Sequence, residues 1–400
     1  MASPPAAPRH TSPPLWLLPS GPDQINGLSL RGDQQRHHKG GLLTLGRNYT
    51  QPIRNINRLS YVFSNTYKLS FSSALFYFLF TLLLFVPSYN AGAIYGKIRA
   101  IQNHRSSELK LFVKNLTHVD FSYFDATRGL LGESWQTDIV LTGKLNDESM
   151  ICDFSIVKKQ IKKWLDENID HMLAIPAEHD GATLTPLAND RVSFQFDHSK
   201  VAAEDKRVFQ CDAPAEAICV LPMAEITPEA AAKWVESKIL NLLPAELAEV
   251  SVRFSPEQIS GAQYQYSHGL KKHSGNCQRI AHGHRSTIEI YADGVRNAEM
   301  EQDWANRWED IYLGTQEDLI RQVTENSVDY HCFSYTSQQG LFELKIDSKQ
   351  VYMLNCDTTV ESLSEHIADT LANEHLGVHI EAHGFEGIGK GAISEKKVSL

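Results

Sequence analysis

The sequence predicts an α+β fold made of two similar units, each an antiparallel sheet with helices packed on one face. The main observation is an internal repeat, because GESWQTDIVLTG (132–143) aligns without gaps with GHRSTIEIYADG (283–294). Further along, VSFQFDHSK (192–200) resembles LFELKIDSK (341–349), and a Thr-x-Glu helix start follows each segment. Each unit is therefore expected to contain two strands, a helix, an extra hairpin, a second helix and a last strand.

The helices and the last strands have local sequence signals. Asp153 is a good N-cap for a helix whose apolar residues, including Val157 and Ile161, share one face. Thr227 and Thr359 are expected to cap the second helix of each unit, because threonine accepts hydrogen bonds from the first helical N–H groups. The last strands are predicted at AEVSVRF (248–254) and GVHIEA (377–382).

Charge divides the chain into a basic head and an acidic body. Residues 1–108 contain eleven Lys/Arg and three Asp/Glu, whereas residues 109–400 contain 27 and 45. An acidic body argues against nucleic acid as the main partner, because phosphate binding requires clustered Lys and Arg. The six cysteines show no framework spacing, so we expect reduced thiols and a cytoplasmic protein. The repeat places the two units at 109–257 and 258–400.

The head contains one apolar segment, residues 69–86, and no charged residue lies between positions 68 and 97. This length is borderline for a membrane span, and the segment lies too far from the start for an ordinary signal peptide. Three interpretations stay open. Residues 1–105 are upstream sequence translated from a start assigned too early, or 69–86 is a genuine membrane anchor, or it is a buried helix.

A cluster of histidines and one cysteine in the second unit predicts a metal site. His282 and His284 are separated by one residue, so on a strand both imidazoles project from the same face. A third histidine, His268 or alternatively His273, would complete a three-nitrogen zinc site with one open position. Cys277 beside this site indicates acid–base or nucleophilic chemistry.

An acidic residue next to a histidine in the first unit predicts a proton relay. Asp170 could orient His171 and stabilise its charged form, so that the imidazole accepts and donates protons. The alternative is a surface pair at the end of a helix, where a histidine is favourable for electrostatic reasons alone.

Four short stretches form a recognisable combination, namely YSHGL (266–270), CQRIAHGH (277–284), MICDF (150–154) and NIDHML (168–173). With these stretches the chain resembles the 6-pyruvoyltetrahydropterin synthase / 6-carboxytetrahydropterin synthase family, once per unit and over nearly all of 109–400. This resemblance implies two tandem tunnelling-fold (T-fold) units, a zinc ion and the substrate 7,8-dihydroneopterin triphosphate. It also implies a homo-oligomer, because these proteins build their sites between subunits.

The resemblance also assigns roles to residues. It implies that His268, His282 and His284 bind zinc and that Cys277 is the catalytic thiol. The Asp-His pair of the family matches Asp170–His171, which is therefore assigned to catalysis as well.

Each unit departs from the family pattern where the other keeps it. In the first unit, Asp125, Leu131 and Glu133 align with the three zinc ligands, and no cysteine is present. In the second unit, Glu309 and Asp310 replace the Asp-His pair. We therefore expect one site shared between the units, with the pair from the first and the metal and thiol from the second.

The family also holds the pterin ring by a carboxylate, which can grip an amino-pyrimidine edge through paired hydrogen bonds. Glu381 is the predicted residue, with Glu386 as its rival, and both follow the second Thr-x-Glu helix. Thr359 and Glu361 are first of all helix-capping residues, and substrate contact is a secondary role for them.

The predicted function is zinc-dependent conversion of 7,8-dihydroneopterin triphosphate to 6-carboxy-5,6,7,8-tetrahydropterin, as in the queuosine and 7-deazapurine pathway. The alternative product is 6-pyruvoyltetrahydropterin, formed by elimination of triphosphate. The four residues between Cys277 and His282 do not choose between these products. A non-catalytic zinc- or pterin-binding protein stays open, as does a membrane-anchored regulator if 69–86 is genuine.

Overall fold

The structure, a computed structural model, describes residues 108–399, which include both predicted units. The apolar segment 69–86 and the rest of the basic head lie outside the described residues, so the three interpretations of the head stay open. Within 108–399, none of the helices combines the length and the apolar character that a membrane crossing requires.

The amino-terminal half has the predicted strands and helices in order, but five strands take the place of the single extra hairpin that was predicted between the two helices. Two strands and a helix are followed by five strands, a second helix and a last strand. They are β1 (Leu109–Asp125), β2 (Gly129–Gly143), α4 (Phe154–Asn168), β3 (Leu173–Pro176), β4 (Ala182–Leu187), β5 (Arg191–Asp197), β6 (Val208–Pro214), β7 (Ile218–Leu221), α5 (Pro228–Ile239) and β8 (Leu247–Pro256).

The carboxy-terminal half repeats this order and adds the short strand β11 and the last strand β18. Its elements are β9 (Gln263–His268), β10 (His282–Ala292), β11 (Val295–Arg296), α6 (Ala298–Arg307), β12 (Ile311–Thr315), β13 (Leu319–Glu325), β14 (Val328–Ser337), β15 (Gly340–Asp347), β16 (Val351–Leu354), α7 (Val360–Glu374), β17 (His379–Phe385) and β18 (Gly391–Lys397).

Each half contributes one large sheet, and the two sheets have corresponding strand orders. The order is β7-β3-β1-β2-β8 in the first and β16-β12-β9-β10-β17-β18 in the second. The fold is α+β, as predicted. The prediction of purely antiparallel sheets is wrong at one side, because β3 and β7 run parallel to β1, and β12 and β16 run parallel to β9. Strand β2 ends beside the start of β1, and α4 then carries the chain back along the sheet, so that β3 pairs in parallel with the last part of β1.

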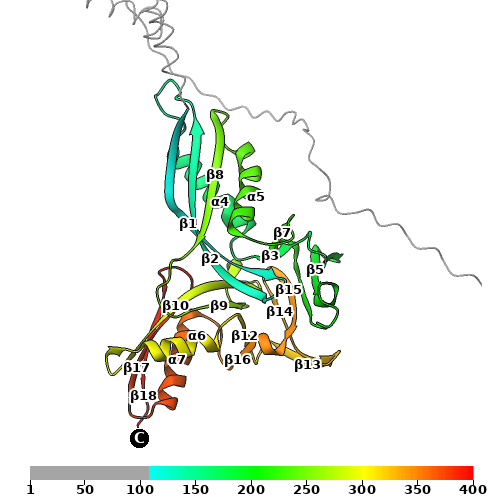
Figure 1. Cartoon of the computed structure of the whole chain (residues 1–400), viewed down its shortest axis with the longest axis vertical. Coiled ribbons are helices and arrows are strands. Elements are labelled where there is room, and N and C mark those ends of the chain that lie inside the picture. The colour runs from blue at the N-terminus through cyan, green and yellow to red at the C-terminus, as the bar shows by residue number, and fades with distance from the viewer. Residues whose placement is uncertain (1–107, 400) are drawn as a thin grey trace, which may run out of the picture. The chain divides into compact units, whose positions relative to one another are not determined.

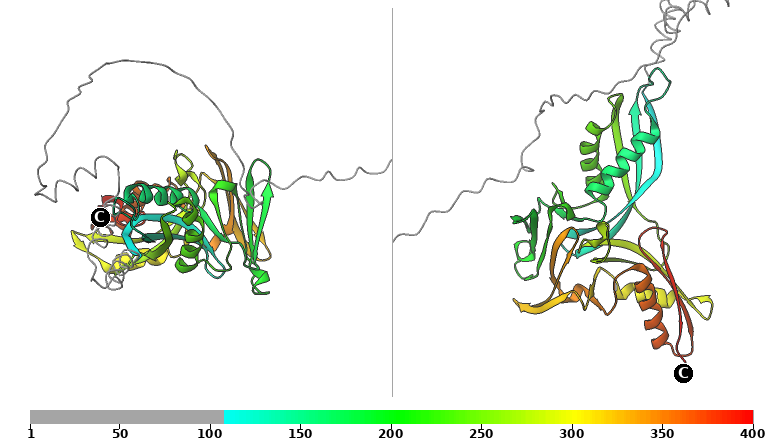
Figure 2. Two further views of the ribbon diagram at one scale, coloured as in Figure 1. Left: turned by 90° about the horizontal axis from the view of Figure 1, so that it is seen from above. Right: turned by 180° about the vertical axis from the view of Figure 1, so that it is seen from behind.

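The helices cover one face of each sheet. Asp153 caps α4 by accepting hydrogen bonds from the next N–H groups, and Thr227 and Thr359 cap α5 and α7, as predicted. Helices α4 and α5 lie together beside β1, β2 and β8, and α6 and α7 lie beside β9, β10 and β17 (Figures 1 and 2). Burial of their apolar stripes against the sheets provides most of the driving force for packing. The buried residues of the first core include Val157, Ile161, Val235, Ile139 and Val252.

A third sheet joins the two halves. Its strand order is β13-β14-β15-β6-β5-β4, so β6 of the first half pairs with β15 of the second. One core packs against it from both halves, and its buried residues include Phe194, Phe196, Phe209, Phe333 and Phe342. The two halves therefore share a hydrophobic core as well as backbone hydrogen bonds.

The two large sheets also touch through equivalent residues. Ser122 of β1 and Ser267 of β9 occupy matching positions, and their hydroxyl oxygens are 2.7 Å apart. Gly132 of β2 and Gly283 of β10 also match, and a Cβ atom on Gly283 would lie 2.7 Å from the Cα atom of Gly132. Only glycine permits this close approach of the two backbones.

Candidate active site

Three histidines of the carboxy-terminal half meet in the core of the protein. In the register of the β9–β10 pair, His268 lies directly opposite His282, and His284 follows two residues later on the same face. All three side chains are fully buried, and one nitrogen of each can be chosen so that all lie within 4.8 Å of one another. The structure thus brings together the three residues that were predicted to bind metal.

The ring nitrogens of these histidines are arranged for a metal ion. The Nδ1 atoms of His268 and His282 lie 3.0 Å from the main-chain oxygens of Thr358 and Arg279, which fixes both rings. The Nε2 atoms of all three histidines, and the Nδ1 atom of His284, are buried without a hydrogen-bond partner among the described residues. Buried polar atoms are normally paired, and unpaired imidazole nitrogens from three clustered histidines fit a tetrahedral zinc ion with one open position.

The protonation state of the histidines also suits a metal. Burial, together with the charge of His284, lowers the pKa of His268 well below its ordinary value. Burial also lowers the pKa of His282. Both rings are therefore neutral at neutral pH, and the neutral imidazole is the form that binds a metal.

The Asp-His pair of the amino-terminal half lies against this cluster. Asp170 and His171 are in the turn between α4 and β3, and the Oδ2 atom of Asp170 is 2.6 Å from the Nδ1 atom of His171. The other side of the ring faces the second half, since donor atoms of His171, Cys277 and His282 lie within 4.8 Å of one another. Cys277 itself is half-buried in a short 3-10 turn, Asn276–Gln278.

His171 is held in its charged form. Burial alone would lower its pKa, but hydrogen bonds with Asp170 and Cys277 outweigh burial and raise the pKa to about 10. The ring is therefore an imidazolium at neutral pH, with one N–H donated to a carboxylate and the other directed at a sulfur. This arrangement places a charged acid, His171, directly beside the sulfur of Cys277.

Two residues at the site have no counterpart in the sequence-based assignment. Asp120 of β1 is 5 % exposed, and its Oδ1 atom lies 3.4 Å from the Nδ1 atom of His284. Arg279 is 4 % exposed and donates a hydrogen bond from Nε to Gln339. The only sequence signal for Asp120 is a charged residue between the apolar residues of a strand, and Arg279 has none.

The predicted pterin-binding carboxylate lies on the other face of the sheet. Glu381 pairs with Tyr291 in the β10–β17 ladder, whereas the histidine face of β10 continues through Ile290, whose partner is Ala382. The Oε1 atom of Glu381 is instead 2.6 Å from the Nε2 atom of His383. The rival, Glu386, lies closer to the histidines, with its Oε1 atom 3.7 Å from the Nε2 atom of His284.

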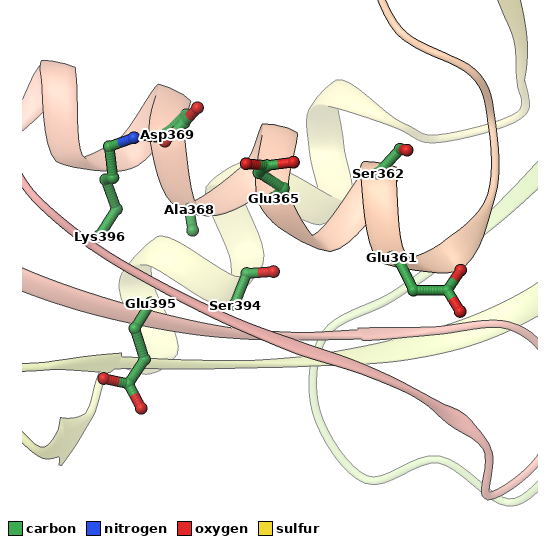
Figure 3. A pocket seen from close by; sticks show the side chains of 8 residues that line it. All are labelled: Glu361, Ser362, Glu365, Ala368, Asp369, Ser394, Glu395 and Lys396. Carbon is green, nitrogen blue, oxygen red and sulfur yellow. Dashed lines mark ion pairs between the residues drawn. The ribbon is translucent and has the colours of Figure 1, made fainter.

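The two residues at the start of α7 also have other contacts. The Oγ1 atom of Thr359 accepts a hydrogen bond from the N–H group of Ser362, so this side chain is the N-cap. Glu361 lines a pocket of about 300 Å³ between α7 and β18, together with residues such as Glu365 and Ser394 (Figure 3). None of the three histidines lines that pocket.

The equivalent position in the amino-terminal half has lost the histidines. Tyr123 lies opposite Leu131 in the β1–β2 register, just as His268 lies opposite His282, and Glu133 takes the place of His284. The alignment of Asp125 with His268 is therefore wrong by two residues. Asp125 instead accepts hydrogen bonds from the next turn, at the N–H groups of residues 127 and 128. Leu131, at the position of His282, has no atom that can bind a metal. The amino-terminal half therefore cannot form the same metal site here.

Comparison with known proteins identifies the carboxy-terminal half. Residues 257–384 match the family model described as 6-pyruvoyl tetrahydropterin synthase. This region is therefore similar to proteins of the 6-pyruvoyltetrahydropterin synthase / 6-carboxytetrahydropterin synthase family. A relative in Methanocaldococcus jannaschii, named as a 6-carboxy-5,6,7,8-tetrahydropterin synthase, is 27 % identical over 128 residues, which are 32 % of this chain and 70 % of the relative.

Solved structures of the family are also similar to this chain. The 6-pyruvoyltetrahydropterin synthase of Plasmodium vivax is 17 % identical, with a TM-score of 0.32, and the match covers 39 % of this chain and 95 % of that one. The Plasmodium falciparum enzyme is 15 % identical, with a TM-score of 0.29, and the match covers 38 % and 100 % of the two chains.

Proposed function

We propose that this protein is a zinc-dependent lyase that converts 7,8-dihydroneopterin triphosphate to 6-carboxy-5,6,7,8-tetrahydropterin. The observation that carries the proposal is the meeting of two half-sites from distant parts of the chain. Asp170–His171 comes from the amino-terminal half, and its imidazole lies against Cys277 and His282 of the carboxy-terminal half. The substrate class, a pterin, is taken from two comparisons. Residues 257–384 match the pterin synthase family model, and the archaeal relative is named as a 6-carboxy-5,6,7,8-tetrahydropterin synthase.

The histidines, the cysteine and the Asp-His pair have separate roles in the proposed reaction. A zinc ion bound by His268, His282 and His284 would act as a Lewis acid that polarises hydroxyl groups of the substrate side chain. Cys277, beside the charged ring of His171, accepts a proton from the carbon framework as the side chain is cleaved or rearranged. His171 then donates a proton from the Nε2 side while Asp170 holds Nδ1, so the pair works as an oriented acid.

Recognition of the pterin ring is assigned to a carboxylate near the last hairpin. Glu381 is the residue that the family resemblance selects, and Glu386 is the one that lies near His284. Thr359 and Glu361 come shortly after Thr358, whose main-chain oxygen lies 3.0 Å from the Nδ1 atom of His268. Of these residues, Glu386 has the contact that best supports a role in binding substrate.

The two halves of the chain, 109–257 and 258–400, are proposed to be tandem T-fold units that arose by duplication. Support comes from the corresponding strand orders of the two sheets and from the matched pairs Ser122–Ser267 and Gly132–Gly283 at their contact. In this scheme, one unit has kept the metal and the thiol, and the other has kept the Asp-His pair.

The protein is further proposed to be a homo-oligomer, because T-fold proteins close their barrels with several sheets. The edge strand β8 pairs with β2 on one side only, and β18 likewise pairs only with β17 among the described residues. Open edges of this kind are available for pairing with further chains. Light scattering coupled to size-exclusion chromatography is expected to give a multiple of the mass of one chain, and a monomer would contradict this expectation.

The first experiment is an assay of the product. Zinc-loaded full-length protein is incubated with 7,8-dihydroneopterin triphosphate, and the product is identified by mass spectrometry. We expect 6-carboxytetrahydropterin together with acetaldehyde. A 6-pyruvoyl product would replace the proposed reaction by triphosphate elimination, and unchanged substrate with zinc bound would favour a binding role without turnover.

A further inference from the structure

Asp120 connects the two half-sites through its side chain. It lies on β1 in the amino-terminal half, whereas the histidine that its carboxylate approaches, His284, lies on β10 in the other half. The other two histidines are oriented by main-chain oxygens at 3.0 Å. Among the three histidines, His284 is thus the one that a carboxylate faces at Nδ1, at 3.4 Å.

The carboxylate of Asp120 is itself held in place. The hydroxyl group of Ser134 donates a hydrogen bond to its Oδ1 atom at 2.5 Å, and the ammonium group of Lys390 lies 3.2 Å from its Oδ2 atom. Both oxygens therefore have a partner in addition to His284. A buried carboxylate with this support keeps one orientation, because other rotamers would leave its charge unpaired.

The main chain of the same residue holds the Asp-His pair. The N–H group of Asp120 donates to the Oδ1 atom of Asp170 at 2.9 Å, and the N–H group of His171 donates to the main-chain oxygen of Asp120 at 2.7 Å. One residue thus contacts a histidine of the metal cluster with its side chain and both members of the proton relay with its backbone.

We infer that Asp120 is a positioning residue that orients His284 toward the metal and keeps the Asp170–His171 pair in register with it. This inference rests on the proposed function, since it requires that the histidines bind zinc. A carboxylate opposite Nδ1 orients the ring and leaves Nε2 free to bind a metal. Loss of such a partner typically weakens metal binding by 10- to 100-fold.

The test compares Asp120→Ala and Asp120→Asn with wild-type full-length protein. Zinc affinity is measured by competition with a chromophoric chelator, and the ligand field is measured from the visible spectrum of the cobalt-substituted protein. We expect the dissociation constant for zinc to rise by about 10- to 100-fold in Asp120→Ala, and less in Asp120→Asn. The cobalt bands should shift in both variants, which a purely structural role would not cause.

Gln265→Ala is the matched control. Gln265 occupies the position on β9 that corresponds to Asp120 on β1, but its amide contacts Gly132 and Glu133. Its zinc affinity and cobalt spectrum should equal those of wild type. Asp120→Asn is nearly isosteric, so it keeps the test valid if the alanine variant does not fold.

Two results would overturn the inference in different ways. If wild type binds zinc tightly and both Asp120 variants bind it equally well with unchanged cobalt spectra, Asp120 has no positioning role while the proposed function stands. If wild type itself binds neither metal, the proposed function fails, and the inference that rests on it fails too.

Discussion

Replacing His284 by alanine is expected to abolish zinc binding and turnover together. The side chain is fully buried, and both of its ring nitrogens are without a hydrogen-bond partner among the described residues. Loss of a residue that only orients a ligand already weakens metal binding by about 10- to 100-fold, so loss of a ligand should exceed about 100-fold. Zinc content is measured by atomic spectroscopy after dialysis against a weak chelator, and activity is measured on the same samples.

His273→Ala is the control for this variant. His273 lies in the loop between β9 and β10, is exposed, and was the alternative third ligand in the sequence-based prediction. It should keep zinc and activity. The stability of both variants without added zinc is compared by thermal unfolding, because an alanine at a buried position also leaves a cavity. Full zinc occupancy in His284→Ala, or its loss in His273→Ala, would contradict the assignment of the ligands.

The parts of the site that the sequence predicts correctly are those set by local periodicity. His282 and His284 share a face because a strand alternates its side chains, and this holds wherever the strand lies. Asp153 and Thr227 cap their helices because the cap involves only the following turn. The order of elements in the two halves follows from the repeat in the same local way.

The parts that it misses depend on register and on contacts between distant segments. Side chains alternate along β17, so Glu381 faces away from the histidines. A shift of one residue in the pairing of β17 with β10 would place it on the histidine face. The hairpin between β1 and β2 is closed by a short turn around Asp125, so an alignment by loop length alone misplaces the counterpart of His268. The local signal of Asp120, a charge between apolar strand residues, does not reveal its partner, because His284 is brought near only when the two sheets meet.

Replacing Asp170 by asparagine is expected to abolish turnover while zinc stays bound. The amide keeps the shape of the side chain, but it removes the negative charge that faces His171 at 2.6 Å. The ring then loses its fixed orientation and much of its proton affinity. General acid–base groups contribute about 10²- to 10⁴-fold to rate, so kcat should fall within that range. Zinc content should be unchanged, because none of the three histidines that are proposed to bind zinc is altered.

The same variant should also change how stability depends on pH. The pKa of His171 is raised to about 10 in the folded protein from 6.5, so this interaction contributes its full stability below about pH 6.5 and loses it as the pH rises toward 10. Urea unfolding at pH 6 should therefore show Asp170→Asn to be less stable than wild type by about 1–3 kcal/mol. The difference should become smaller toward pH 10.

Glu309→Gln provides the matched control for Asp170→Asn. The registers of β1 with β3 and of β9 with β12 place Glu309 at the position that corresponds to Asp170, yet its side chain is exposed and belongs to the half that has lost the Asp-His pair. This variant should keep wild-type turnover, zinc content and pH dependence. Equal activity of Asp170→Asn and Glu309→Gln would show that the amino-terminal half contributes no acid to the reaction, and the shared site would have to be abandoned even if zinc binds.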